Sequence, residues 1–270
     1  MAGSPSGEPR ATGAAAALVL AGILITDFVP LVVGGGPWPW TRAVGDAAKL
    51  AFVLLVALRV WRGRAAAVTD GDWRRLAVAF GVIVLGDLLL LLRLHVAGVV
   101  IFALAQVALL VRHGAGLPAR LRADGWRRHG RALAAVVGGA VLLTALSAVA
   151  LGALAPAALA PGASAPGGGL RLAVGAAYAL ILAASLAAAW LVPVAGVLPG
   201  GRAVQAAAGM TLFFLCDLTV AGGQILPDPA LRAVARASTF VAYAPALWLL
   251  ASSGRVPASP GDDLVRRRVG

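Results

Sequence analysis

Long apolar runs recur from one end of the chain to the other, and no other feature limits its fold so strongly. Each run holds roughly 17–22 residues, which is enough to cross the hydrocarbon core of a bilayer as a helix. With 60% hydrophobic and 13% charged residues and a mean hydropathy of +0.90, the chain is unlike a soluble domain. The sequence therefore predicts an all-α, polytopic transmembrane bundle of about eight helices. The expected spans are Ala14–Val33, Val44–Val60, Leu76–Leu92, Val96–Val111, Ala132–Leu154, Leu170–Val192, Ala203–Ala221 and Val234–Ala251.

The spans form one predicted membrane domain over residues 13–252, with a polar tail over 1–12 and a basic tail over 253–270. Both tails are rich in polar residues and are expected to be disordered. The first span is too long for the core of a signal peptide, and Asp27 interrupts it, so we expect it to be retained.

The net charge of +12 comes from arginines that lie in the gaps between apolar runs. In a soluble protein this charge would favour nucleic acid as a partner. Here the two longest basic gaps, Trp61–Arg75 and Arg112–Arg131, would meet anionic lipid headgroups, and no nucleic-acid partner is expected. The positive-inside rule, with eight spans, places these gaps and both termini in the cytoplasm. Arginine in place of lysine, with abundant Ala, Gly and Val, is typical of GC-rich bacterial genes. We expect a multi-pass protein of a bacterial inner membrane.

Four ionisable residues lie at a similar depth in the predicted spans: Asp27, Lys49, Asp87 and Asp217. An aspartate at the centre of a membrane helix costs on the order of 2.5–3.5 kcal/mol on insertion scales. Each of the four lies near the predicted outer end of its helix, roughly 6–9 Å from the outer boundary at 1.5 Å per residue. They therefore share one layer. Asp87 and Asp217 are either buried carboxylates that are capped by hydroxyls or paired with Lys49, or a carboxyl pair that faces a polar cavity, and we expect the second arrangement.

The two aspartate motifs, Leu85-Gly86-Asp87-Leu88 and Leu215-Cys216-Asp217-Leu218, resemble each other. They lie four spans apart, on helices that run in the same direction. This relation predicts two four-helix halves related by an axis along the membrane normal.

For the other polar residues of the spans, two interpretations stay open. Lys49, the single lysine, is either a counter-ion for Asp46, three residues earlier, or an anchor for a headgroup beside the aspartates. Asp27 is either a polar contact between helices or part of the binding site. The same choice holds for Gln106, Tyr178 and Tyr243, which either join helices by hydrogen bonds or contact a substrate.

The sequence lacks the motifs that are typical of several cofactor and enzyme classes. His95, His113 and His129 show no metal-ligand spacing, so no metal is expected. The single cysteine, Cys216, forms no intrachain disulfide and has no evident partner that would make it a nucleophile. No serine stands in a GxSxG setting, and no late helix carries a lysine that would bind retinal.

The order and spacing of several short motifs are similar to those of the YhhN-type lysoplasmalogenase family of eight-helix membrane proteins, over roughly residues 45–253. The motifs are Lys49 opening an apolar helix, Gly86-Asp87 followed by leucines, Gly98 with Phe102, Tyr178, Gly209 through Leu212-Phe213 to Asp217, and Tyr243 with Ser252-Ser253. The sequence departs from the family pattern at three positions. Leu50 stands where the family usually has proline, Gln106 where it has histidine, and Cys216 where it has serine.

The resemblance implies an enzyme that cleaves the vinyl-ether bond of lysoplasmalogens into a fatty aldehyde and a glycerophospho-headgroup. It implies Asp87 and Asp217 as the catalytic pair, a membrane lysolipid as the substrate, and a reaction that needs no metal or organic cofactor. Two other classes stay open from the residues alone. A proton-coupled transporter would also use carboxylates inside the membrane, and a non-catalytic lipid-binding protein would need no reactive pair. The oligomeric state is not determined by the sequence.

Overall fold

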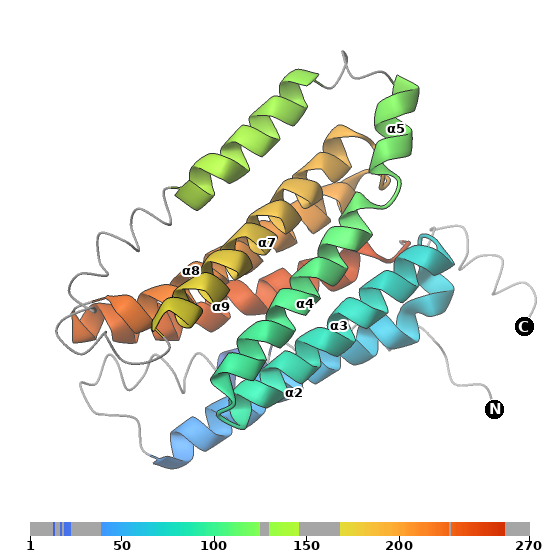
Figure 1. The fold of residues 1–270 in the computed structure, drawn as a ribbon. Coiled ribbons are helices and arrows are strands. Elements are labelled where there is room, and N and C mark those ends of the chain that lie inside the picture. The colour runs from blue at the N-terminus through green and yellow to red at the C-terminus, as the bar shows by residue number, and fades with distance from the viewer. Residues whose placement is uncertain are drawn as a thin grey trace, which may run out of the picture.

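The computed structural model describes residues 39–124, 130–145, 168–226 and 228–256, together with Gly13, Ala17 and residues 19–22. Within these residues the fold is helical, apart from one isolated antiparallel bridge between Ala67 and Arg255 (Figure 1). The elements are α2 (Pro39–Arg62), the 3-10 helix η1 (Gly63–Ala66), α3 (Asp70–Leu91), α4 (His95–Gly114), α5 (Leu117–Asp124), a helix over Gly130–Ala145, α7 (Gly168–Val194), α8 (Gly201–Ile225) and α9 (Pro229–Ser253).

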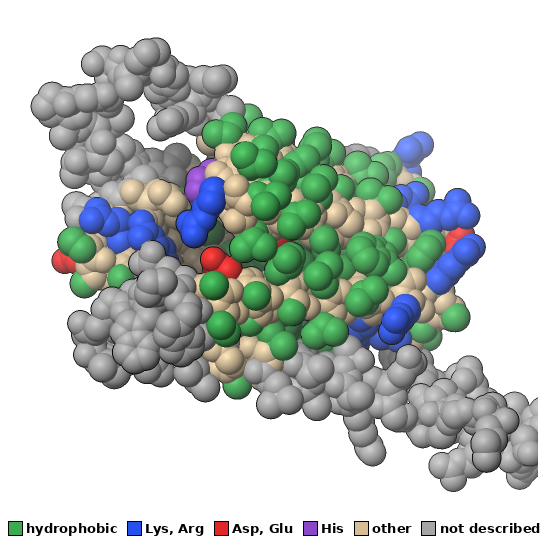
Figure 2. Space-filling model, turned by 90° about the horizontal axis from the view of Figure 1, so that it is seen from below, with side chains coloured by type: hydrophobic (Ala, Val, Ile, Leu, Met, Phe, Trp, Pro, Cys, Tyr) green, Lys and Arg blue, Asp and Glu red, His purple; other side chains and the backbone are tan. Residues whose placement is uncertain are grey.

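The molecule is an all-α membrane bundle, as the sequence predicts. In the described part of the chain, four helices are long and apolar enough to cross a bilayer: His95–Ala123, Gly175–Val194, Gly201–Gln224 and Pro229–Ser253. Helices α2 and α3 have the length of a span, with 24 and 22 residues, but charged side chains such as Lys49 and Asp87 lower their hydropathy. Figure 2 shows hydrophobic side chains over the middle of one face and Lys and Arg side chains gathered toward its two ends.

The predicted spans and loops differ from the structure in places. Most of the first predicted span, and the second half of the fifth, lie outside the described residues. The segment Arg112–Arg131 was expected to be a basic loop, and this is wrong at its start. Arg112 belongs to α4 and is buried, and Leu117–Asp124 forms α5. The folded part also continues past residue 252 to Val256, whose backbone N–H donates to the carbonyl of Ala66.

The long helices pack as a closed ring. Helix α2 contacts α3, α3 contacts α4, α4 contacts α7, α7 contacts α8, α8 contacts α9, and α9 returns to α2. The contacts of α2, α3 and α4 correspond in order to those of α7, α8 and α9, so the ring keeps the same neighbours when each helix is replaced by its counterpart. This is the order that a duplication of two halves would give, although the duplication itself stays a prediction. Inside the ring, the large side chains Phe52, Phe80, Met210, Phe213 and Leu247 are fully buried.

Two helix starts follow directly from local sequence. Thr69 precedes α3, and its hydroxyl accepts a hydrogen bond from the backbone N–H of Asp72 at 3.0 Å. Asp228 precedes α9, and its carboxylate accepts from the N–H groups of Ala230 and Leu231 at 2.6 and 3.1 Å, with Pro229 in the first turn. Such side chains satisfy the N–H groups that a helix leaves unpaired at its beginning.

Glycines let two pairs of helices approach closely beside the aspartates. A Cβ on Gly86 would lie 2.9 Å from ring carbons of Phe102, so this glycine allows α4 to pack against α3 next to Asp87. A Cβ on Gly209 would lie 3.1 Å from both the carbonyl oxygen of Ala246 and the backbone nitrogen of Leu250. Because these last two atoms are backbone, α8 and α9 could accept the added carbon only by moving apart.

We therefore expect Gly209→Ala to lower the stability of the bundle by about 1–3 kcal/mol, the usual cost of overpacking. Gly81→Ala is the matched control, because Gly81 is also inside a helix and the nearest atom to its added Cβ, on Trp61, is 4.0 Å away. Alanine is the better helix former, so Gly81→Ala should be neutral or stabilising by up to about 1 kcal/mol. Unfolding midpoints of the detergent-solubilised variants measure both effects, and equal midpoints would contradict the close contact.

Candidate functional site

Asp87 is bound by a tyrosine from a helix that is not its neighbour in the ring. The hydroxyl of Tyr243, on α9, donates to Oδ2 of Asp87, on α3, at 2.7 Å. Helices α3 and α9 are not neighbours in the ring of contacts, so this hydrogen bond crosses the interior. The side chain of Tyr243 is 6% exposed, which confirms that it points inward. Asp87 therefore faces the inside of the bundle rather than lipid.

Asp217 has the same kind of partner. The hydroxyl of Tyr178, on α7, donates to Oδ2 of Asp217, on α8, at 2.8 Å. Each of the two carboxyl groups that the sequence singled out is therefore held by the phenol group of a different tyrosine.

A cluster of aromatic rings surrounds Tyr243. Phe213, from α8, lies 5.5 Å from the Tyr243 ring, and Phe240, from α9, lies 5.9 Å away, both edge-to-face. Phe102, from α4, lies 6.4 Å from both Tyr243 and Phe213. Edge-to-face pairs add roughly 0.5–1.5 kcal/mol each to the packing. These rings fix the tyrosine, and through it one oxygen of Asp87.

The second oxygen of each carboxyl group has no hydrogen bond to a tyrosine. Within the described part of the chain, Oδ1 of Asp87 and Oδ1 of Asp217 accept no hydrogen bond. The arrangement provides two oriented carboxyl groups, each with one oxygen that has no hydrogen-bond partner among the described residues.

The other residues singled out in the sequence have different surroundings. Lys49 is half-buried on α2. Asp27 lies outside the described residues. Gln106, on α4, is fully buried, and neither atom of its amide has a hydrogen-bond partner among the described residues. It lies four residues after Phe102, on the same face of the helix, and therefore one turn deeper than the aromatic cluster. An unpaired buried amide costs about 1–3 kcal/mol, so the site favours a polar molecule beside it.

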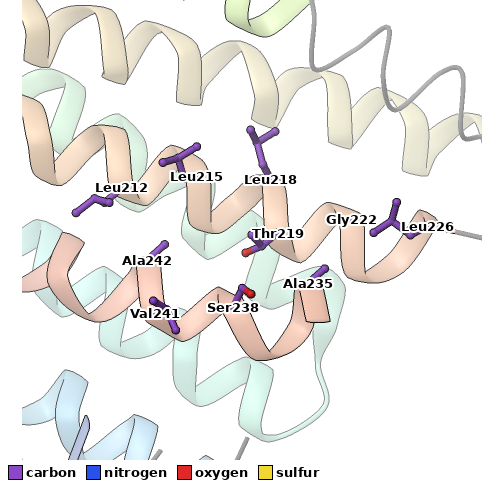
Figure 3. Close-up of a pocket in the computed structure, with 10 residues that line it drawn as sticks. All are labelled: Leu212, Leu215, Leu218, Thr219, Gly222, Leu226, Ala235, Ser238, Val241 and Ala242. Carbon is purple, nitrogen blue, oxygen red and sulfur yellow. The ribbon is translucent and has the colours of Figure 1, made fainter. Parts of the chain in front are cut away.

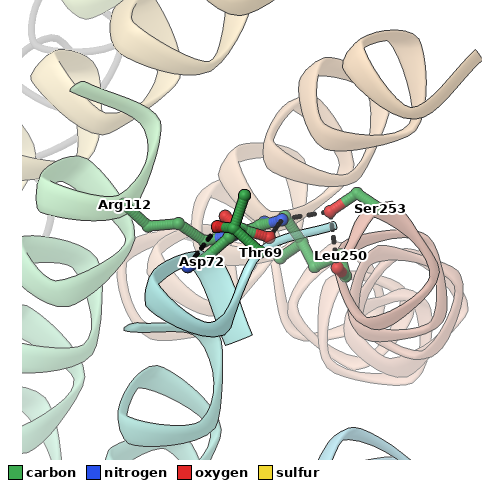
Figure 4. Close-up of polar contacts among 5 residues, drawn as sticks. All are labelled: Thr69, Asp72, Arg112, Leu250 and Ser253. Carbon is green, nitrogen blue, oxygen red and sulfur yellow. Dashed lines mark hydrogen bonds and ion pairs between the residues drawn. The ribbon is translucent and has the colours of Figure 1, made fainter. Parts of the chain in front are cut away.

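A second polar cluster was not foreseen from the sequence. Arg112, at the end of α4, donates from Nε and Nη2 to the two oxygens of Asp72 at 2.8 and 3.1 Å, and from Nη1 to Oγ of Ser253 at 2.9 Å (Figure 4). Ser253 in turn donates to the carbonyl of Leu250 at 2.7 Å. The cluster joins α3, α4 and α9. The cluster could not be recognised from the sequence, because Arg112 is followed by a segment that is rich in arginine. Asp72, an acidic residue in the first turn of an apolar helix, was the one indication of a buried ion pair.

An apolar groove runs along the outside of α8 and α9 (Figure 3). Its volume is about 580 Å³. Thr219 lies in its wall and donates to the carbonyl of Cys216 at 2.7 Å, and it lies 3.1 Å from the hydroxyl of Thr239. Neither Asp87 nor Asp217 lines the groove, because Asp217 is turned toward α7. The groove is thus a surface for apolar chains and is separate from the carboxyl pair.

Comparison with known proteins gives one clear result. A family model described as the YhhN family matches residues 45–254. The chain belongs to the YhhN family. This is the lysoplasmalogenase family, and the matched region contains every site residue named above except Asp27. No curated protein and no solved structure matches the chain.

The match to the YhhN family also includes the Arg112 cluster, from Asp72 to Ser253. Arg112 is 3% exposed, and its guanidinium group binds both Asp72 and Ser253. The substitution Arg112→Met would therefore leave the Asp72 carboxylate buried without a compensating charge. We expect it to lower the free energy of unfolding by about 3–5 kcal/mol.

Arg74→Met is the matched control for this variant. Arg74 also pairs with an aspartate, Asp70, at 3.0 Å, but both side chains are exposed. An exposed ion pair contributes about 0–1 kcal/mol, so this variant should unfold close to the parent protein. Unfolding of the purified variants in detergent decides the matter, and equal losses for the two substitutions would show that burial of the Arg112 pair is unimportant.

Proposed function

We propose that this membrane protein is a lysoplasmalogenase, which hydrolyses the vinyl-ether bond of a lysoplasmalogen to a fatty aldehyde and a glycerophospho-headgroup. The observation that carries the proposal is the pair of interior carboxyl groups, Asp87 and Asp217, each held by one tyrosine and each with one oxygen that has no hydrogen-bond partner among the described residues. Membership of the YhhN family supports it.

Vinyl-ether hydrolysis begins with transfer of a proton to carbon. A carboxyl group that still holds its proton gives it to the β-carbon of the O–CH=CH unit, and the positive charge moves to the oxygen and the α-carbon. The second carboxyl group, as carboxylate, stabilises this oxocarbenium ion and takes a proton from the water that attacks the α-carbon. The hemiacetal so formed breaks its bond to the glycerol oxygen and releases the aldehyde.

We propose that the two carboxyl groups face one apolar site. Two charges in such a site are each desolvated and repel each other, so one group can keep its proton while the other is ionised. In our proposal Asp87 and Asp217 share the roles of acid and base. Tyr178 and Tyr243 orient the carboxyl groups, and the rings of Phe102 and Phe213 pack around Tyr243.

The remaining polar residues are proposed to bind the substrate. Gln106 has an amide with no partner among the described residues and could hydrogen-bond to a glycerol oxygen or to the attacking water. Lys49 and Asp27 lie on the first two expected spans, near the predicted outer boundary, where a lysolipid headgroup would lie. The lysine ammonium is suited to the headgroup phosphate.

Substitution of the carboxyl groups tests the proposal. Asp87→Asn and Asp217→Asn keep the shape of the side chain but cannot transfer the proton, so each should lower turnover of a lysoplasmalogen by about 10²-fold or more. The double variant should be little worse than either single variant, because residues that act as a unit are not additive. Release of fatty aldehyde by the purified protein is the readout, with unfolding midpoints to confirm that the variants fold.

Asp70→Asn is the matched control, since Asp70 is an exposed carboxylate on the same helix as Asp87 and should leave turnover unchanged. A saturated alkyl-ether analogue should bind and inhibit without reacting, because it has no vinyl carbon to protonate. The proposal fails if the folded parent protein releases no aldehyde from vinyl-ether lysolipids. Transport of protons or solute by the same preparation in liposomes would then favour a transporter.

A further inference from the structure

The ends of α2 and α9 lie side by side (Figure 1), and each brings an arginine to this end of the bundle. Arg59 belongs to the last turn of α2, and Arg255 comes directly after the end of α9. The last residue of α9, Ser253, is ten residues from Tyr243, which corresponds to about 15 Å along the helix. The two arginines are therefore separate from the carboxyl groups.

Arg255 packs on the helix that carries Arg59. A Cβ on Gly63 would lie 3.5 Å from Nε of Arg255. Gly63 follows Arg59 by four residues, and the chain stays helical from α2 into η1, so the two positions share one face of the helix. The side chains of Arg59 and Arg255 are therefore neighbours, and their positive charges repel each other.

Both arginines are held in place. The backbone of Arg255 forms the bridge with Ala67, and next to it the N–H of Val68 donates to the carbonyl of Gly254 at 3.2 Å. Cζ of Arg59 lies 4.0 Å from the ring centre of Trp248, on α9, where the face of the ring attracts the cation. Both arginine side chains are half-buried. The two charges are therefore fixed beside each other.

Neither charge is compensated within the described part of the chain. Neither Arg59 nor Arg255 pairs with a carboxylate or donates a side-chain hydrogen bond to another described residue. Arg64 provides the contrast. It also lies over a tryptophan, Trp73, at 5.3 Å, but its guanidinium group pairs with Asp70 at 2.8 Å. Two adjacent positive charges without a carboxylate favour an anion that neutralises both.

The surroundings favour a phosphate group that belongs to a lipid. Trp248 lies five residues before the end of α9, a helix long and apolar enough to cross a bilayer, and tryptophan is typical of the membrane interface. Ser252 follows Trp248 by four residues on the same face, and its hydroxyl makes no hydrogen bond to another described residue. The several oxygens of a phosphate group suit two guanidinium groups and a hydroxyl. Basic pockets between membrane helices bind anionic headgroups in this way.

We propose that Arg59 and Arg255, with the hydroxyl of Ser252, bind the phosphate group of an anionic lipid headgroup at this end of the bundle. The phosphate takes the place of the carboxylate that these arginines lack, and Trp248 holds Arg59 in position. The proposal is independent of the reaction at Asp87 and Asp217.

Purified protein in nanodiscs tests this proposal. Its unfolding midpoint is measured in phosphatidylcholine with an increasing fraction of phosphatidic acid, and separately with oleate, an anionic amphiphile without phosphate. We expect a saturable rise of the midpoint with phosphatidic acid and a smaller rise with oleate. Inorganic phosphate, added to phosphatidylcholine nanodiscs at constant ionic strength, should leave the midpoint unchanged. Equal responses to phosphatidic acid and oleate, or a response to inorganic phosphate in place of phosphatidic acid, would overturn the proposal.

Substitution of the arginines locates the effect. Arg255→Gln should raise the half-saturating fraction of phosphatidic acid by about tenfold or more, as expected for loss of a charge-assisted hydrogen bond, and Arg59→Gln should act in the same way. Because Arg255→Gln also removes the repulsion, its midpoint in pure phosphatidylcholine should equal that of the parent or exceed it.

Arg64→Gln is the matched control, since it makes the same change of charge at the same end of the molecule, on an arginine that is already paired. Its half-saturating fraction should stay within about twofold of the parent. If Arg255→Gln responds to phosphatidic acid as Arg64→Gln does, the proposal is wrong.

Discussion

The hydrogen bond from Tyr243 to Asp87 is central to this molecule, since it joins α3 and α9, two helices that are not neighbours in the ring of contacts. In a bilayer, a carboxyl group on a helix is tolerated only when it faces the bundle interior and finds partners there. The tyrosine provides that partner, and its ring is packed on several sides by phenylalanines. The close approach of α3 and α4 at Gly86 places one of these rings beside the aspartate. The packing of the aromatic rings and the hydrogen bond of Asp87 therefore depend on each other.

Helix α9 takes part in both polar clusters. It carries Tyr243 toward Asp87 and, ten residues later, Ser253 toward Arg112. At 1.5 Å per residue these contacts lie about 15 Å apart along the helix. The bundle is thus joined by hydrogen bonds at two depths. One set orients the carboxyl group of Asp87, and the other compensates the buried charge of Arg112.

Much of this could be predicted from the sequence. The apolar runs predicted the helices. Asp87 and Asp217 were recognisable because a carboxyl group inside a membrane span is costly and usually marks a functional site. Which tyrosine binds which aspartate could not be predicted, because it depends on the order of helices in the ring. Phe102 and Phe213 were indistinguishable from other apolar residues around them. Arg112 was assigned to a loop because arginines surround it, and its partner Asp72 is 40 residues away.

The origin of the hydrogen on the product tests the central claim most directly. The purified protein hydrolyses a vinyl-ether lysolipid in D₂O, and the fatty aldehyde is trapped at once and analysed by mass spectrometry. If a carboxyl group protonates the β-carbon, the aldehyde carries one deuterium on the carbon next to the carbonyl group. An aldehyde released without deuterium at that carbon would contradict acid catalysis by the carboxyl pair.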